Sequence, residues 1–271
     1  MKSHPLVRAI SMGVLLAVFC FGLFAGQVTR HSFATQFREL PNAPPSSLHL
    51  LGTDGLGRDV FARLAYGTRV SLLLAPAAAL LSTLIGGILG SFAGLVGGWL
   101  ERAILAAADL SMALPLLFVL LALRALLPLG ISPVLSVIAT FALLGALGWH
   151  TSLRVVWAAS RNLRSSDFLL LARASGCTRW KMIWYHFLPN LRPVLTAQFW
   201  ISIPIFVLTE ATLSMLGLGV MEPLPSWGNL LRGLEDFSAV GSNPWSLSPL
   251  ILLVLVVICF QLALPAQEEF A

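Results

Sequence analysis

The segment VSLLLAPAAALLSTLIGGILGSFAGLVGGW, from Val70 to Trp99, contains no charged residue. A membrane-spanning helix needs about 20 predominantly apolar residues, so this segment predicts a transmembrane helix. Its glycines Gly86, Gly90, Gly94 and Gly98 recur every four residues and lie on one helix face. Small residues at that spacing let two helix backbones approach closely in lipid. We therefore expect this face to pack against another helix of the chain or of a partner chain, with a pore-lining role as the alternative.

The composition of the whole chain points to the same environment. Of its 271 residues, 57% are hydrophobic and only 11% are charged, with a mean hydropathy of +0.86. Soluble globular chains carry roughly 25% charged residues, so the composition places the protein in a membrane. The sequence predicts an all-α polytopic membrane protein with about six transmembrane helices. The other predicted spans are Ala9 to Val28, Ala103 to Leu127, Val134 to Trp149, Val194 to Leu218 and Leu247 to Pro265.

The first predicted span follows Lys2 and Arg8 and so resembles a secretory signal peptide. Its apolar run is long for a signal peptide, and no clean A-x-A cleavage site follows it. We therefore expect a retained anchor helix over residues 1–28. An external loop over residues 29–69, a membrane domain over residues 70–265 and a short tail over residues 266–271 complete the predicted organisation.

The distribution of basic residues predicts the orientation, because Lys and Arg near span ends favour the cytoplasmic side. The segment from His150 to Arg192 carries seven basic residues and a single acid, Asp167. We therefore expect this segment and both chain termini to lie in the cytoplasm, with the loops Gln27 to Arg69 and Gly219 to Ser246 outside. The seven basic residues are Arg154, Arg161, Arg164, Arg173, Arg179, Lys181 and Arg192.

The stretch DFLLLARASGCTRWKMIWYHFLPN, from Asp167 to Asn190, interrupts the apolar pattern within this basic segment. Phe168 to Ser175 can form a short helix, and Gly176 can then turn the chain with a positive φ at little cost. A second helix is expected from Thr178 to Leu188, and Pro189 is expected to stop it. The predicted object is a helix, a glycine elbow and a second helix, with Asn190 capping the span that follows.

The second helix of this elbow is expected to be amphipathic. Trp180, Ile183, Trp184 and Phe187 follow the i, i+3, i+4, i+7 spacing of one helix face. A basic amphipathic helix can rest on the bilayer surface, or it can dock into a groove of a cytoplasmic protein. The residues alone leave these two alternatives open.

Two acidic residues, Asp109 and Glu210, fall inside predicted spans, where charge is expensive and suggests function. Neither has an obvious basic partner at its own depth, although Asp109 can reach toward Arg102 on the same helix face. Glu210 is expected near the outer interface, where hydration is cheap. Both are candidate residues of a translocation path, and structural acids facing protein or water are the alternative.

The sequence lacks the patterns of several catalytic sites. A P-loop needs a lysine directly after glycine, but the only lysines are Lys2 and Lys181, and neither follows glycine. No HExxH or GxSxG motif is present. The histidines look scattered and the cysteines unpaired, so we expect no catalytic residues, no metal site, no cofactor and no nucleic-acid partner. An autonomous secondary carrier or channel is the alternative function, although the internal repeats typical of that class are not evident.

The sequence from Ala172 to Gly176, ARASG, followed by HFLPN from His186 to Asn190, resembles the EAA loop of binding-protein-dependent ABC importer permeases. In that family the loop forms a coupling helix that docks on a cytosolic ATPase subunit. The resemblance implies a coupling loop over residues 150–192. Leu170 and Leu171 occupy the place of the family's usual Glu-Ala pair. The implied coupling residues are Ala172, Arg173, Ala174, Gly176, Arg179, Trp180, Ile183, His186 and Pro189.

Two further motifs are similar to the DppC/OppC-type branch of that family, which imports dipeptides, oligopeptides and, in some members, nickel. One runs from Leu51 to Leu72 and includes LGTDGLGRDV; the other joins Glu210–Val220 to PSWGN at 225–229. The resemblance implies a type I ABC importer (MetI-like) permease in a bacterial inner membrane. It also implies a homologous permease subunit in a heterodimer, cytosolic ATP-binding subunits, an extracytoplasmic substrate-binding protein and surrounding lipid as partners. The tail departs from the family pattern.

Local chemistry gives simpler expectations for the same motifs. Thr53 or Asp54 is expected to cap a helix that carries Asp59 and Arg63, because short polar side chains favour helix N-termini. Contact with an external binding protein is the alternative for this turn. Trp227 is expected to anchor an outer loop at the membrane interface, where tryptophan is enriched.

Overall fold

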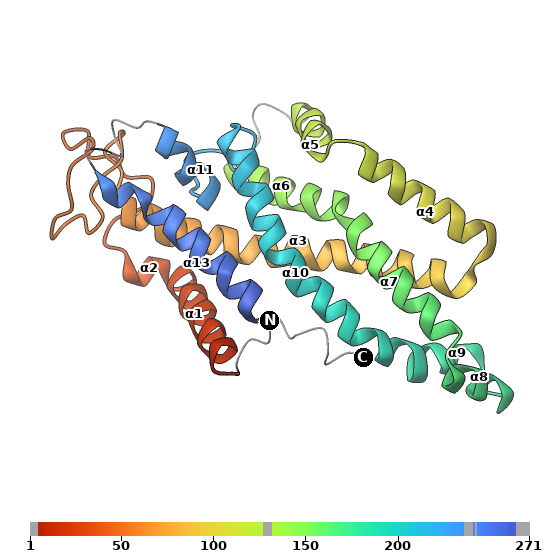
Figure 1. Ribbon diagram of the computed structural model, residues 1–271. Coiled ribbons are helices and arrows are strands. Elements are labelled where there is room, and N and C mark those ends of the chain that lie inside the picture. Colours follow the sequence, from red (N-terminus) through yellow and green to blue (C-terminus); the bar gives the residue numbers. More distant parts are fainter. Residues whose placement is uncertain (1–4, 127–131, 236–240, 242, 264–271) are drawn as a thin grey trace.

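The computed structural model of the protein describes residues 5–126, 132–235, 241 and 243–263, and these residues form an elongated helical bundle (Figure 1). One end of the bundle carries the irregular segment 29–59, and we call it the loop end. The opposite end carries α8 (Asp167–Ala174) and α9 (Arg179–Met182), and we call it the elbow end. The predicted all-α class is confirmed. The remaining principal helices are α1 (Pro5–Leu23), α2 (Ala25–Val28), α3 (Val60–Val96), α4 (Gly98–Ala113), α5 (Leu116–Ala125), α6 (Pro133–Leu147), α7 (Trp149–Arg164), α10 (Leu188–Met215), α11 (Trp227–Arg232) and α13 (Ser248–Ala263).

Within the described residues, five helical stretches are long and apolar enough to cross a membrane. They are Pro5–Leu23, Val60–Val96, Pro133–Arg164, Trp180–Met215 and Pro244–Ala263. The remaining predicted span, Ala103 to Leu127, which is third along the chain, is not a continuous helix. It is divided at Pro115 into α4 and α5, because the residue before a proline avoids the helical conformation and Leu114 is extended, with φ −82° and ψ 125°. Figure 1 shows α4 and α5 following one another along one side of the bundle.

The long helix α3 begins at Val60, earlier than the predicted Val70. Its N-cap is Asp59, whose side chain accepts a hydrogen bond from the backbone N–H of Ala62 at 2.8 Å. The prediction that Thr53 or Asp54 caps this helix is therefore wrong. Asp54 instead closes the preceding turn, where its Oδ1 accepts the backbone N–H groups of residues 56 and 58. The glycine-rich turn thus ends against the first turn of α3.

The glycine face of α3 packs against α7 of the same chain, which confirms the within-chain alternative for Gly86, Gly90 and Gly94. A Cβ atom at Gly90 would lie 2.6 Å from the carbonyl oxygen of Leu153, too close for any side chain. Gly86 and Gly94 meet α7 at similarly short distances. Gly98 does not belong to this face, because it has φ +72° and begins α4. The two backbones approach closely only because the glycines lack side chains.

The helix α7 replaces the loop that was expected to begin at His150. Only Gly148 separates it from α6, and together the two form the helical stretch Pro133–Arg164. The apolar pattern ends near Trp149, but the chain stays helical because small and apolar side chains still recur on one face. Those residues are buried in the α7 face toward α3, and they are Ser152, Leu153, Val156 and Ser160.

The main hydrophobic core lies between α1, α3, α6, α10, α11 and α13. Its large buried members include Phe141, Leu144, Phe206, Trp227 and Val256. A second, smaller cluster lies at the elbow end and joins α7 to the elbow through α8, α9 and the start of α10. The elbow is therefore packed onto the bundle and does not hang free.

Candidate functional site

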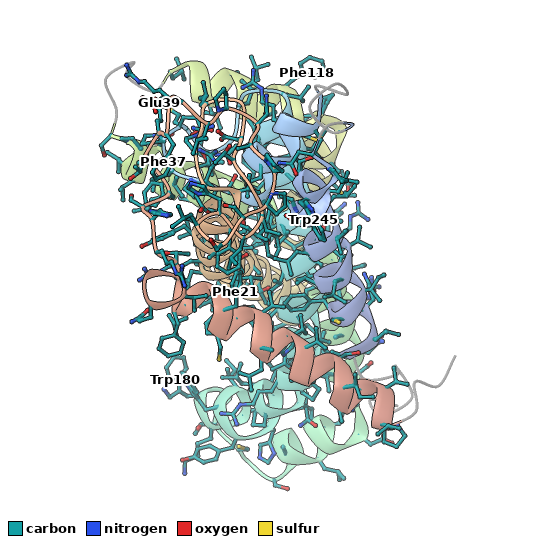
Figure 2. The ribbon with its side chains drawn as sticks, turned by 90° about the vertical axis from the view of Figure 1, so that its left-hand side faces the viewer. Phe21, Phe37, Glu39, Phe118, Trp180 and Trp245 are labelled. Carbon is teal, nitrogen blue, oxygen red and sulfur yellow. The ribbon has the colours of Figure 1, made fainter. Side chains whose placement is uncertain are left out.

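The two ends of the molecule carry different kinds of side chains. Figure 1 shows α8 and α9 at the end of the bundle opposite the irregular segment 29–59, and Figure 2, viewed from the loop end, shows Trp180 well apart from Phe37 and Glu39. The elbow end presents aromatic side chains to the outside. The loop end holds buried ion pairs and hydrogen bonds.

The predicted turn at Gly176 is present. Gly176 has φ +74°, and among the described residues nothing lies within 4 Å of a Cβ built at this position. The requirement for glycine therefore comes from the backbone conformation and not from crowding. Helix α8 ends at Ala174 and α9 begins at Arg179, so the elbow has the predicted order of helix, turn and helix.

The second helix of the elbow does not end at Pro189, and that prediction is wrong. After α9 the chain forms a π-helix, Ile183–Phe187, and then continues directly into α10. The N–H of Leu188 donates to the carbonyl of Ile183, five residues earlier, which widens the turn. Pro189 then occupies the first turn of α10, where its missing N–H is tolerated. Asn190 is not a cap, because its Nδ2 donates to the carbonyl of His186 at 2.6 Å.

The π-helix also divides the predicted amphipathic face. Phe187 is buried and packs with Met182, whereas Trp180 is 71% exposed and Trp184 is 53% exposed. A spacing of i, i+3, i+4, i+7 marks one face only while the helix keeps 3.6 residues per turn. Because the π-helix changes that period, Phe187 turns inward and the two tryptophans stay outside.

The elbow exposes five large apolar side chains, which we together call the aromatic surface. Its rings stand next to one another, with the Trp180 and Trp184 centroids 6.2 Å apart in an edge-on arrangement. Exposed apolar patches on soluble parts of a protein mark interaction sites. Its members are Leu170, Leu171, Trp180, Trp184 and Tyr185.

The other predicted coupling residues lie around this surface. Ala172, Ile183 and His186 are half-buried, and Ala174, Gly176 and Pro189 are exposed. The side chains of Arg173 and Arg179 lie outside the described part of the chain. Leu170 and Leu171, which stand where the resemblance leads one to expect Glu-Ala, add exposed apolar area at the elbow.

Asp109 has a basic partner that the sequence analysis missed. It forms an ion pair with Arg154 of α7 and does not turn toward Arg102. Both side chains are about half exposed. A second polar contact joins the same helices, because the Trp157 Nε1 donates to the Glu101 carboxylate at 2.8 Å. The sequence analysis could not predict which residues of α4 and α7 meet, because it expected a loop where α7 lies.

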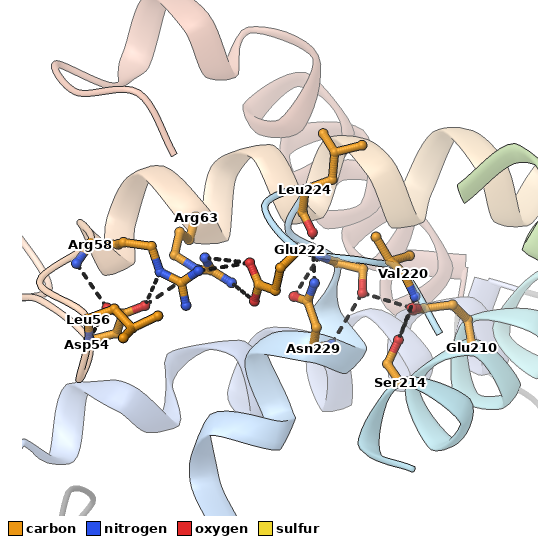
Figure 3. A network of polar contacts seen from close by, with 11 residues as sticks. Asp54, Leu56, Arg58, Arg63, Glu210, Ser214, Val220, Glu222, Leu224 and Asn229 are labelled. Atoms are coloured by element: carbon orange, nitrogen blue, oxygen red, sulfur yellow. Dashed lines mark hydrogen bonds and ion pairs between the residues drawn. The ribbon is translucent and has the colours of Figure 1, made fainter. Parts of the chain in front are cut away.

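Glu210 is fully buried, so the expected hydration at the outer interface is wrong. Its Oε1 accepts hydrogen bonds from Ser214 at 2.6 Å and from Ser226 at 2.8 Å. Within the described residues, its Oε2 has no hydrogen-bond partner. Ser226 also begins α11 with a capping box that involves Asn229. Glu210 therefore holds α11 against α10 (Figure 3).

A network of ion pairs at the loop end joins the start of α3 to the loop that follows α10 (Figure 3). The Arg63 side chain is 2% exposed, and its guanidinium donates to both carboxylate oxygens of Glu222, at 2.8 and 3.1 Å. Arg58 binds Glu222 at 2.8 Å and Asp54 at 2.7 Å. The sequence analysis did not single out Glu222. The available signal was an acidic residue early in the segment that follows α10, opposite the arginines at the start of α3.

Trp227 is a core residue, and its expected place at the membrane interface is wrong. It is fully buried at the start of α11. Its ring N–H donates to the Thr68 hydroxyl at 3.0 Å, and its backbone N–H donates to the Ser71 hydroxyl at 3.2 Å. Tryptophan buried in this way usually finds a partner for its N–H. Trp227 thus fixes α11 on α3.

The expectation of scattered histidines is wrong for one pair. The rings of His31 and His49 lie 5.1 Å apart at the loop end, and Asp59 joins them through a 2.8 Å contact with His49. The spacings between His31, His49 and Asp59 are longer than those of the short sequence motifs that suggest metal sites. The irregular fold of segment 29–59 brings them together.

Comparison with known proteins identifies relatives over most of the chain. Residues 86–267 match the family model described as "Binding-protein-dependent transport system inner membrane component". The chain is 37% identical over 218 residues to a Brucella suis biovar 1 protein that carries the name peptide permease, covering 80% of this chain and 70% of that protein. It is 30% identical to the oligopeptide transport system permease protein OppC of Bacillus subtilis, covering 88% and 75%. It is 32% identical to the dipeptide transport system permease protein DppC of the same organism, covering 90% and 74%.

Proposed function

Because the chain belongs to the family of inner membrane components of binding-protein-dependent transport systems, we propose that it helps to import peptides or a related small solute. It is a transmembrane permease subunit of an ABC importer. Peptides are the proposed cargo because the relatives reported above are named for peptide, oligopeptide and dipeptide transport. A nickel cargo stays a prediction.

The aromatic surface of the elbow is the observation that carries the proposed mechanism. It exposes Trp180, Trp184 and Tyr185 on α9 and the π-helix after it, at the elbow end of the bundle (Figure 1). Burying aromatic side chains at the centre of an interface supplies much of its binding energy. We assign this surface to docking on a cytosolic ATP-binding subunit, so that ATP hydrolysis takes place on that partner and not on this chain.

The packing behind the aromatic surface supports transmission of movement into the membrane. Phe187 and Met182 of the elbow pack with Val156 of α7 in one buried cluster. Helix α7 is in turn locked to α3 through the glycine face. A displacement of the elbow therefore carries α7 and α3 with it, because close-packed interiors do not deform continuously.

This assignment places the elbow end and both chain termini in the cytoplasm. The loop end then faces outward, where a substrate-binding protein would deliver the cargo. We further propose a heterodimer with a homologous permease subunit. A cavity of about 320 Å³ between α5 and α10, lined by Leu116, Leu120, Ile205, Leu208, Thr209, Thr212 and Leu213, is the proposed part of the path on this chain. A path role for Asp109 and Glu210 stays a prediction.

A pair of substitutions at Gly176 tests the coupling role. Gly176→Val places a β-branched side chain at φ +74°, a conformation that costs roughly 1–2 kcal/mol for an L-residue. Gly176→Asn is the matched control, because asparagine visits this conformation readily. In the reconstituted complex with its ATPase, second permease and binding protein, we expect Gly176→Val to lower ATP-driven uptake of labelled peptides at least tenfold while ATP hydrolysis continues. We expect Gly176→Asn to stay within about twofold of wild type.

Wild-type uptake by correctly inserted Gly176→Val would contradict the coupling role. Uptake by this chain alone in liposomes, driven by an ion gradient, would instead favour an autonomous carrier. The two outcomes are distinguishable because uptake by an autonomous carrier would continue without ATP and without the other subunits, whereas uptake by the importer complex would not.

A further inference from the structure

We propose that His31, His49 and Asp59 form a binding site for a divalent transition-metal ion, of which Zn²⁺ is the best match. One ligand atom from each residue lies within 4.8 Å of the other two. Two imidazoles and a carboxylate are donors that Zn²⁺ prefers. The proposal is independent of the transport function and concerns how the loop end is held together.

The His49 and Asp59 side chains already lie side by side in a buried position. The His49 Nδ1 and the Asp59 Oδ2 are 2.8 Å apart, and both side chains are about 95% buried. A metal ion at this position would take the place of the proton that the two atoms share, so that both can act as donors. Asp59 uses its other oxygen to cap α3 at Ala62, so a metal ion at Oδ2 leaves the helix cap intact.

His31 supplies an independent observation that points to a ligand. Its Nε2 is buried, and within the described residues it has no hydrogen-bond partner. A buried polar atom without a partner is destabilising, and an ion or a water bound to it is one recognised explanation for such an atom. A metal ion beside the His49–Asp59 pair satisfies this nitrogen.

The surroundings suit a bound cation. The Phe37 ring meets the His31 ring edge-on at 5.0 Å and the His49 ring at 4.7 Å, which gives the site an apolar wall. His31 itself is only half-buried, so an ion can reach the site from its side. Ligand atoms around a tetrahedral zinc ion lie roughly 3.3 Å apart, so a small rotation of His31 brings the three donors to bonding distance.

The consequence of metal binding is a clamp on the irregular segment 29–59. His31 lies near the start of this segment, His49 lies late in it, and Asp59 is the N-cap of α3. One ion therefore ties the segment to itself and to the helix at the loop end. Metal ions that bind only the folded state add their binding free energy to stability.

Zinc titration of the full-length, tag-free chain in detergent tests this proposal. After chelator treatment we expect the wild type to bind one Zn²⁺ per chain by elemental analysis and competition with a chromophoric chelator. His31→Gln should weaken Zn²⁺ binding at least tenfold. Replacing a residue that only hydrogen-bonds to a metal ligand commonly costs 10–100-fold in affinity. Removing one of the proposed donors should cost at least as much. His150→Gln, which replaces a histidine elsewhere in the chain, should bind Zn²⁺ like wild type.

Two further measurements keep the test decisive. Zn²⁺ should raise the thermal midpoint of the wild type and of His150→Gln but not of His31→Gln. Co²⁺ should give visible d–d absorption that disappears in His31→Gln. His31 is the chosen position because Asp59 also caps α3, so its replacement would confuse metal loss with misfolding. Equal Zn²⁺ binding by wild type and His31→Gln would overturn the proposal.

Discussion

The two sides of α7 are held by opposite means. Toward α3, backbone meets backbone across Gly86, Gly90 and Gly94. Toward α4, the contact consists of polar groups on long side chains, Asp109 with Arg154 and Glu101 with Trp157. The first contact leaves no room for even a Cβ atom between the two backbones. The second consists of side-chain contacts that can lengthen or re-form, so we expect α4 to shift more easily against α7 than α3 does.

The largest expected effect comes from placing a methyl group in the tight contact. At Gly90 a Cβ would lie 2.6 Å from a carbonyl oxygen of α7, whereas at Gly87 it would meet only the tip of the Leu195 side chain at 2.9 Å. We expect Gly90→Ala to destabilise the chain by about 1–3 kcal/mol through overpacking. Gly87→Ala should cost less than about 1 kcal/mol, because a flexible side chain can move away.

Denaturant unfolding in mixed micelles, with the two alanine variants run in parallel, measures this difference. If Gly90→Ala and Gly87→Ala were equally stable, the backbone contact between α3 and α7 would not set the stiffness of this pair of helices. That result would remove the contrast between the two sides of α7.

A medium effect is expected at the polar side. Trp157→Phe keeps the ring but removes the N–H that binds Glu101 at 2.8 Å. A hydrogen bond to a charged group contributes about 1.5–3 kcal/mol when buried, and this one is partly exposed, so we expect a loss of about 1 kcal/mol. The same unfolding assay measures it, and Trp245→Phe at the loop end is the control. A loss as large as that of Gly90→Ala would mean that α4 is held as firmly as α3.

The smallest effect is expected from the ion pair between Asp109 and Arg154. Both side chains are about half exposed, and exposed ion pairs contribute about 0.2–1 kcal/mol. We expect Arg154→Gln to lower stability by that amount or less. A double-mutant cycle with Asp109→Asn isolates the interaction. A coupling free energy above about 2 kcal/mol would show that the pair is a fixed part of the fold and not an adjustable one.

The glycine face shows what the sequence could and could not predict. The four-residue spacing of Gly86, Gly90 and Gly94 was enough to predict a close helix contact. The identity of the partner was not predictable, because α7 carries polar residues such as Arg154 and was expected to be a loop. An amphipathic helix has no continuous run of apolar residues, and such a run is the signal from which spans were predicted.

The elbow shows a second limit. The turn at Gly176 followed from residue chemistry, and it is present with the expected positive φ. The burial of Phe187 did not follow, because a single π-helical segment changes the residue period and no sequence pattern announced it. Long-range contacts such as Arg63 with Glu222 and His31 with His49 depend on the path of irregular loops, which local patterns do not determine.

The length of α3 has a mechanical consequence. Its 37 residues, from Val60 to Val96, extend about 55 Å at 1.5 Å per residue, well beyond the roughly 30 Å of hydrocarbon in a bilayer. Both ends therefore project into water or lipid headgroups, or the helix tilts. A swing of about 10° around one end moves the other end by roughly 10 Å. A pivot of α3 near the elbow end would therefore turn a small angle into a displacement of this size at the loop end.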